Sequence, residues 1–300
     1  VALGGLTLKN PVLTASGTFG YGTEASAFGD VRFLGGIVVK GLSLEARPGN
    51  PGGRIAETPC GMLNSIGLEN IGADRFVREI LPRLPWQETP VVANIYAGDY
   101  EEFSELAAYL ADQEGIAGLE VNISCPNVRA GGARFGQDPD MAAKACSAVR
   151  EKAGDKPVIL KLSPNVKDVT EIARAVEDAG ADAVSLINTL SGMAVDIRTR
   201  RPVLGSVIGG LSGPAIKPVA LQAVYRVCGA VSIPVVGVGG ITSAEDAMEF
   251  ILVGARAVQV GSASFADPQL PFSLVSRLEE LCEELEIESW EDFRGRIETD

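Results

Sequence analysis

Short runs of Val, Ile and Leu alternate with amphipathic segments along the whole chain. Eight runs are nearly continuous in apolar residues and are often introduced by Gly or Pro; they cover residues 11–16, 35–41, 90–95, 118–124, 157–163, 183–189, 234–240 and 257–263. Strands buried on both faces of a parallel sheet have this pattern, because helices cover the sheet on each side. The runs therefore predict eight parallel strands.

The segments between the strands have the spacing of amphipathic helices. They cover residues 100–114, 139–153, 167–179, 214–228 and 243–253. The last of them begins at Thr242 or Ser243, either of which can act as an N-cap, with acidic residues in the first turn. Eight strand–helix repeats predict an α/β fold, a (β/α)8 TIM barrel, in a single domain over residues 1–300. An open doubly wound sheet is the alternative, but the strand order shows no break.

Two connections are longer than the barrel needs. Residues 42–68 and 190–213 are rich in Gly, Pro and Arg, and each follows the end of a strand. Long connections of this kind are usually functional, so we expect both to cover the C-terminal face of the barrel.

Composition and charge narrow the class of protein. The net charge is −13 with no run of basic residues, which argues against nucleic acid or an anionic membrane as a partner. No apolar run is long enough to cross a bilayer, and the first residues lack the apolar segment of a signal peptide, so we expect a cytoplasmic protein. The five cysteines are widely spaced, without a C-x-x-C pair, which disfavours disulfides, iron–sulfur clusters and metal sites. Because the chain has no histidine, proton transfer near neutral pH must use another group.

Polar residues and glycines stand at the ends of the predicted strands, where a barrel places its active site. They are Ser16, Lys40, Asn94, Asn122, Lys161, Asn188, Thr189, Gly239, Gly240, Gly261 and Ser262. A single asparagine here could be a turn residue, but three asparagines and two lysines at strand ends indicate a binding site. Each lysine interrupts an apolar run, where an unpaired ammonium is costly to bury. A lysine reaching out from the rim is the alternative to one that meets a negatively charged ligand.

Glycines end the last two predicted strands. "GVGGITSAED" and "QVGSASFADP" each lead from a strand into a helix, and backbone N–H groups there can bind phosphate. The pair indicates a phosphate-bearing cofactor, although "G-x-G-G" alone could be a tight turn. The dinucleotide fingerprint does not follow the first strand.

Cys125 stands just past a strand end, in "LEVNISCPN", and a Gly-rich stretch that could form a flap follows it. A thiol has a pKa near 8.5, which makes it the best available base in a site without histidine. The other cysteines, Cys60, Cys146, Cys228 and Cys282, are expected to be small buried hydrophobic residues, the last three of them within helices.

Several long motifs resemble one enzyme family. "MLNSIGLEN", "NISCPN", "LKLSPN", "INTL", "GGLSGPAIKP" and "GVGGI" are similar to class 1 dihydroorotate dehydrogenases, and the match extends over nearly the whole chain. "NVRAGGARFG" and "LINTL" resemble class 1B more than class 1A. The resemblance implies oxidation of (S)-dihydroorotate to orotate in pyrimidine biosynthesis, with FMN as the cofactor.

The resemblance also assigns roles to individual residues. Cys125 would remove the C5 proton while hydride leaves C6 for flavin N5. The substrate would be bound by Lys40, Asn64, Ser65, Ile66, Gly67, Leu68, Asn122, Asn188 and Thr189. FMN would be bound by Ser16, Lys40, Gly41, Asn94, Asn122, Lys161, Ile187, Gly213, Gly239, Gly240, Gly261 and Ser262.

Class 1B catalytic subunits pass electrons to a second subunit that carries FAD and a [2Fe-2S] cluster and reduces NAD⁺. The resemblance therefore implies a heterotetramer of two catalytic and two electron-transfer chains. The alternatives are a class 1A homodimer that uses fumarate, an FMN reductase similar to dihydropyrimidine dehydrogenase, and a non-catalytic barrel that binds phosphate ligands.

Overall fold

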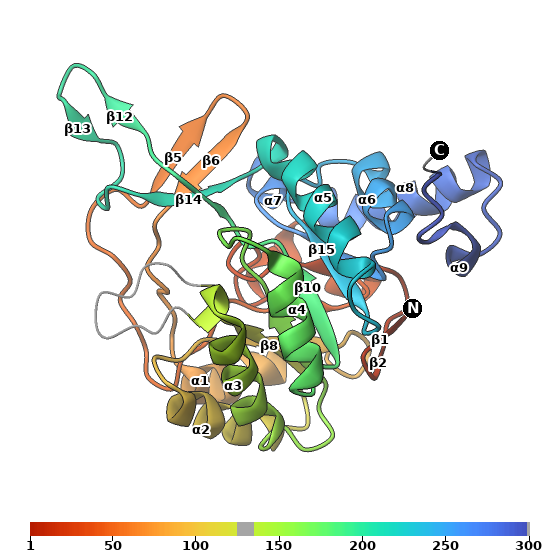
Figure 1. Ribbon diagram of the computed structural model, residues 1–300, viewed down its shortest axis with the longest axis horizontal. Helices are drawn as coiled ribbons and strands as arrows, with labels where there is room; N and C mark the ends of the chain where they lie inside the picture. The colour runs from red at the N-terminus through yellow and green to blue at the C-terminus, as the bar shows by residue number, and fades with distance from the viewer. Residues whose placement is uncertain (125–134, 299–300) are drawn as a thin grey trace.

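The computed structural model describes residues 1–124 and 135–298, and a parallel sheet lies at its centre (Figure 1). This sheet has eight strands. Neighbouring strands follow the order β3, β16, β15, β10, β9, β8, β7 and β4. Their bounds are Val12–Thr14 (β3), Ile37–Val38 (β4), Val91–Ile95 (β7), Gly118–Asn122 (β8), Val158–Lys161 (β9), Ala183–Leu186 (β10), Val235–Val238 (β15) and Ala257–Val260 (β16). Each lies within one of the eight predicted runs, so all eight strand predictions are confirmed.

The sheet closes on itself between β3 and β4. Leu13 and Gly36 form a parallel bridge, and the Gly35 N–H donates to the Val12 carbonyl oxygen at 2.8 Å. The Thr14 hydroxyl accepts from the Val38 N–H at 3.0 Å and donates to the Val38 carbonyl oxygen at 3.2 Å. The fold is therefore the closed barrel, and the doubly wound alternative is wrong.

Helices cover the outside of the barrel. The longer ones are α2 (Tyr100–Ala111), α3 (Pro139–Arg150), α4 (Val169–Asp178), α5 (Lys217–Cys228), α6 (Ala244–Leu252) and α8 (Leu270–Glu284). The shorter ones are η1 (Glu24–Ala27), η2 (Val31–Phe33), α1 (Ala73–Arg75), η3 (Phe76–Ile80), η4 (Leu81–Arg83), η5 (Phe135–Gln137), η6 (Pro214–Ile216), α7 (Ala263–Ala266) and α9 (Trp290–Phe293). The five predicted helices correspond to α2 to α6, and Ser243 caps α6 in a capping box with Asp246.

The two long connections fold together into a second sheet. It contains β5 (Ile55–Thr58) and β6 (Gly61–Asn64) from the first connection and β11 (Leu190–Gly192) and β14 (Gly209–Ser212) from the second. Its order is β11, β14, β6, β5, all antiparallel. The hairpin of β12 (Val195–Asp196) and β13 (Arg201–Pro202) extends beyond it, away from the barrel (Figure 1).

A hairpin at the N-terminus packs into the barrel interior. It consists of β1 (Ala2–Leu3) and β2 (Leu6–Thr7). Leu3, Leu6 and Leu8 form one buried cluster with inward residues of the barrel strands, such as Val92 and Val236. This apolar packing fills the end of the barrel that is opposite the carboxyl ends of the strands. A larger apolar cluster packs the helices against the outside of the barrel.

The cysteines other than Cys125 fit the expectation only in part. Cys146, Cys228 and Cys282 lie in α3, α5 and α8, where the first is buried and the other two are half-buried. Cys60 is exposed, because it lies in the turn between β5 and β6, so its predicted burial is wrong. Within residues 1–124 and 135–298, no helix combines the length and the apolar character needed to cross a membrane.

Candidate active site at the C-terminal rim

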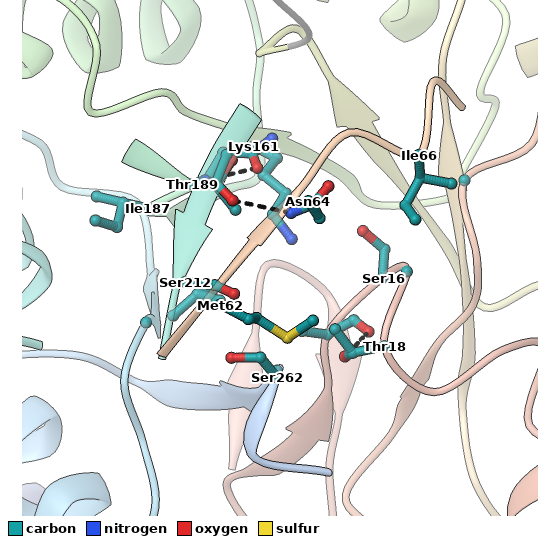
Figure 2. Close-up of a pocket in the computed structure, with 18 of the residues that line it drawn as sticks. Ser16, Thr18, Met62, Asn64, Ile66, Lys161, Ile187, Thr189, Ser212 and Ser262 are labelled. Carbon is teal, nitrogen blue, oxygen red and sulfur yellow. Dashed lines mark hydrogen bonds between the residues drawn. The ribbon is translucent and has the colours of Figure 1, made fainter. Parts of the chain in front are cut away.

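A cavity of about 230 Å³ lies at the carboxyl ends of the barrel strands, beneath the second sheet (Figure 2). Its residues come from segments far apart in the sequence. In Figure 2, Lys161 and Thr189 lie on one side of the cavity, with Met62 and Ser262 on the opposite side. The rim and the two long connections together build this site.

Most of the predicted site residues meet in this cavity. Those that line it are Ser16, Lys40, Gly41, Asn64, Ile66, Gly67, Leu68, Asn94, Asn122, Lys161, Ile187, Asn188, Thr189, Gly213, Gly239, Gly240, Gly261 and Ser262. Ser65 does not line it: its buried hydroxyl contacts the Asn50 amide at 3.0 Å and the Ser206 hydroxyl. Cys125 lies outside the described residues.

The floor of the cavity is polar and buried. Lys161 is 4% exposed, and its Nζ lies 3.7 Å from the carboxylate of Glu120, a residue of β8 that is completely buried. Asn94 is also completely buried, and its Nδ2 donates to Glu120 at 2.6 Å. Its Oδ1 has no hydrogen-bond partner among the described residues, so the floor offers both an ammonium and a free acceptor.

Lys40 brings a second ammonium to the cavity. It follows β4, is half-buried, and makes no ion pair within the described part of the chain. Burial lowers the pKa of Lys40 below its ordinary value, and the carboxylate of Glu69 offsets part of that effect. A charged lysine in this position is stabilised by an anion that enters the cavity.

The loop after β6 carries unusual backbone geometry. Gly67 has a φ of 76°, and Leu68 has a φ of 60°, which is uncommon for a residue with a side chain. Across the described residues, no acceptor bonds to the backbone N–H groups of Ile66, Gly67 or Leu68. A strained loop that lines a cavity and carries unused donors is suited to binding an anionic or carbonyl group.

Amide side chains lie on the Lys161 side of the cavity. The Asn122 Oδ1 accepts from the Ser124 N–H at 3.2 Å and from the Asn188 Nδ2 at 3.5 Å. The Asn188 Oδ1 accepts from the Thr189 N–H at 2.8 Å. These bonds fix the two amides and leave the Asn122 Nδ2 as a donor for a ligand.

Glycine turns form the opposite side. Gly240 follows β15 with a φ of 73°, and a Cβ there would lie 2.7 Å from the Lys217 Cβ. Gly213, with a φ of 100°, would bring a Cβ within 2.6 Å of the Gly61 Cα. Within residues 1–124 and 135–298, the N–H groups of Gly240 and Ser262 donate to no other group. These turns let the backbone approach a phosphate closely.

An ion-pair cluster holds the glycine turns in place. Lys217, at the start of α5, contacts Asp246 at 2.6 Å and Glu249 at 2.9 Å, both from α6. Burial opposes ionisation of Asp246, but the Lys217 ammonium and the Thr242 donors outweigh it and hold the pKa of Asp246 below its usual value. The cluster ties the helix after Gly213 to the helix after Gly240.

Ten further residues line the cavity but are not among the site residues predicted from the sequence. They are Ala15, Gly17, Thr18, Ile55, Met62, Gly210, Ser212, Ile216, Val238 and Phe265. The sequence gives a signal for Gly17 and Thr18, which continue the polar stretch after β3. Ile55 and Met62 reach the cavity because the second sheet folds over the rim, and no local pattern predicts that contact.

Comparison with known proteins assigns the chain to a family. The family model described as dihydroorotate dehydrogenase matches residues 1–282. The chain is 64% identical to the dihydroorotate dehydrogenase B (NAD(+)) catalytic subunit of Solidesulfovibrio magneticus, over 99% of this chain and 97% of that protein. It is 60% identical to the catalytic subunit of the same name from Maridesulfovibrio salexigens, over 98% of this chain and 96% of that protein. The chain belongs to the dihydroorotate dehydrogenase family.

Proposed function

We propose that this chain oxidises (S)-dihydroorotate to orotate, a step of pyrimidine biosynthesis, with FMN bound in the rim cavity. The observation that carries the proposal is the set of groups gathered there: two lysines, an amide oxygen without a partner among the described residues, glycine turns and a strained loop. The names of the similar proteins agree with this activity.

The cavity residues fit FMN. The buried Asn94 Oδ1 would accept from an N–H of the isoalloxazine ring, and the Lys161 ammonium would lie against an electron-rich edge of that ring. The turns at Gly213, Gly240 and Ser262 would hold the phosphate through backbone N–H groups. When bound, FMN supplies the acceptor for a hydride from the substrate. The remaining cofactor contacts would come from Ser16, Lys40, Gly41, Asn122, Ile187, Gly239 and Gly261.

The substrate would bind between the strained loop and the amides. A pyrimidinedione ring alternates N–H donors with carbonyl acceptors, and asparagine amides can satisfy both kinds. Asn64, Asn122, Asn188 and Thr189 would bind the ring. Lys40 and the N–H groups of residues 66–68 would bind the carboxylate. Ser65 would support the loop through its bonds to Asn50 and Ser206.

Cys125 would take the proton from C5 of the substrate. A thiolate is a competent base near neutral pH, and the chain contains no histidine that could replace it. Burial raises the pKa of both the Cys146 and the Cys228 thiol to about 12, so neither is suited to this role. The second sheet would exclude water from the ring while the proton moves.

Electrons would leave through a separate subunit. The similar proteins are named as catalytic subunits of an NAD(+)-linked enzyme. We propose a partner that carries FAD and a [2Fe-2S] cluster, in a heterotetramer of two catalytic and two electron-transfer chains.

The isolated chain tests the whole proposal. It should retain yellow FMN and reduce an artificial electron acceptor with dihydroorotate, while reducing NAD⁺ only slowly until a partner subunit is added. Absorbance and steady-state assays with each acceptor measure this. Orotate should inhibit, and uracil should not. Rapid NAD⁺ reduction by the chain alone would contradict the two-subunit proposal, and turnover of uracil would favour the dihydropyrimidine dehydrogenase type.

Replacement of the thiol tests the base. Cys125→Ser should keep FMN but slow its reduction by dihydroorotate by roughly 10²–10⁴-fold near neutral pH, because a serine hydroxyl is a much weaker base. The rate should recover as the pH rises. Anaerobic stopped-flow absorbance measures it, with Cys282→Ser, which changes a thiol on α8, as the matched control. Unchanged reduction in Cys125→Ser would remove this residue from the mechanism.

The lowered pKa of Lys40 predicts how orotate affinity depends on pH. Binding of a carboxylate favours the ammonium form, and that form is lost as the pH rises through the lowered pKa of Lys40. The Kd for orotate should therefore increase in the alkaline range, with a limiting slope of about tenfold per pH unit. This increase should begin at a lower pH than it would if the carboxylate were bound by an exposed lysine, whose pKa is not lowered. Titration calorimetry in the Cys125→Ser background avoids the contribution of the thiol. In Lys40→Gln the pH dependence should disappear; if it persists, Lys40 does not bind the carboxylate.

A methyl group at Gly240 should reduce binding of FMN. In Gly240→Ala the Cβ would meet Lys217 at 2.7 Å, in addition to the strain of a positive φ. Gly154→Ala is the matched control, because Gly154 has a φ of 56° but no atom within 4 Å of its added Cβ. The control should lose only about 1–2 kcal/mol of stability and keep its flavin. The ratio of flavin to protein absorbance measures the difference, and equal ratios in both variants would show that the Gly240 turn does not hold the cofactor.

A further inference from the structure

Glu120 is a completely buried carboxylate beneath the cavity, and it does not line the cavity itself. Its Oε1 accepts from the Ser185 hydroxyl at 2.8 Å and from the Gln259 Nε2 at 2.6 Å. Its Oε2 accepts from the Asn94 Nδ2 at 2.6 Å and lies 3.7 Å from the Lys161 Nζ. Side chains from four other barrel strands, β7, β9, β10 and β16, therefore converge on this one carboxylate of β8.

An ionised carboxylate can only accept hydrogen bonds, and this fixes the orientation of both neighbouring amides. Asn94 must direct its nitrogen to Glu120, so its oxygen faces the other way, where it has no partner among the described residues. Gln259 must also direct its nitrogen to Glu120, and its oxygen then accepts from the Lys161 Nζ at 3.4 Å. Glu120 thus sets which atoms of Asn94 and Lys161 are available to a ligand.

The charge of Glu120 has a second consequence. Lys161 is 4% exposed, and burial of an ammonium without a counter-charge is costly. Across the described residues, Glu120 is the carboxylate within ion-pair distance of Lys161. Since the contact is 3.7 Å, longer than a direct hydrogen bond, Glu120 balances the charge without using the donors that Lys161 can offer to the cavity.

We propose that Glu120 is a positioning residue for the cofactor: it orients the Asn94 amide as an acceptor and holds the Lys161 ammonium in place beneath the cavity. This inference rests on the proposed function, because FMN is the ligand that those two residues would contact. Glu120 contributes through them and does not touch the flavin.

Glu120→Gln keeps the shape of the side chain but replaces one acceptor with a donor. Either Asn94 or Gln259 must then turn its amide, and Lys161 loses its counter-charge. FMN release after dilution of the holoprotein should be about tenfold to a hundredfold faster than in the unmodified protein, measured by the fluorescence of free FMN. Thr14→Val is the matched control: Thr14 is equally buried in the barrel, but its hydroxyl bonds only to Val38, so the rate of FMN release should not change in this variant.

A double-variant cycle separates positioning from general loosening of the barrel. Each single variant is expected to increase the rate of FMN release by some factor, and independent effects would multiply these two factors in the double variant. If Glu120 acts through Lys161, the double variant Glu120→Gln with Lys161→Met should release FMN at least about fivefold more slowly than this product predicts. Effects that simply multiply would overturn the proposal, and so would an unchanged release rate in Glu120→Gln. Unmodified protein that binds no FMN would instead contradict the proposed function.

A second variant keeps the test valid if Glu120→Gln does not fold. Gln259 contacts both Glu120 and Lys161 but does not line the cavity. Gln259→Met keeps the side-chain volume and removes both contacts, so it should release FMN several-fold faster than the Thr14→Val control. Equal release rates in these two variants would overturn the positioning role.

Discussion

A closed barrel of parallel strands places the carboxyl end of every strand on one rim, and the candidate site depends on this constraint. Asn94, Asn122 and Lys161 are separated by many residues in the sequence, yet they meet because all three lie near the carboxyl ends of β7, β8 and β9. Helices and the N-terminal hairpin bury the remaining surface, so the rim can carry polar groups without loss of the apolar core.

The interior of the barrel is divided between apolar packing and one polar layer. Towards the N-terminal hairpin the interior is filled by residues such as Leu3 and Val92. Beneath the cavity it contains Glu120 with its hydrogen-bond partners, all of them completely or almost completely buried. A buried carboxylate is tolerated there because neutral donors and an ammonium surround it. The same layer prepares a fixed pattern of charge and acceptors for a ligand, which lowers the cost of binding.

Eight strands, five helices and eleven of the cavity residues could be predicted from the pattern along the chain, and seven more cavity residues from the family resemblance. The strand and helix predictions succeed because a short segment of sequence shows both the burial and the periodicity of its residues. Strands such as β9 and β10 are almost entirely apolar, so a lysine or asparagine that interrupts such a run is easily recognised. Cys60 shows the limit of that approach. Its residue type suggests burial, but it lies in a hairpin turn of the second sheet, where the side chain is exposed.

The barrel, its polar rim and the family are evident from the sequence, because they follow from short apolar runs and from motifs that are continuous in the chain. The folded structure was needed to show that β6 pairs with β14 above the cavity, that Ser65 supports the loop from outside the cavity, and that Glu120 bonds to Asn94, Ser185 and Gln259. The physical reason is that these contacts join residues up to 150 positions apart, as in the pairing of Met62 with Ser212. Strand register and barrel closure fix these contacts, and a local pattern of apolar and polar residues does not reveal either of them.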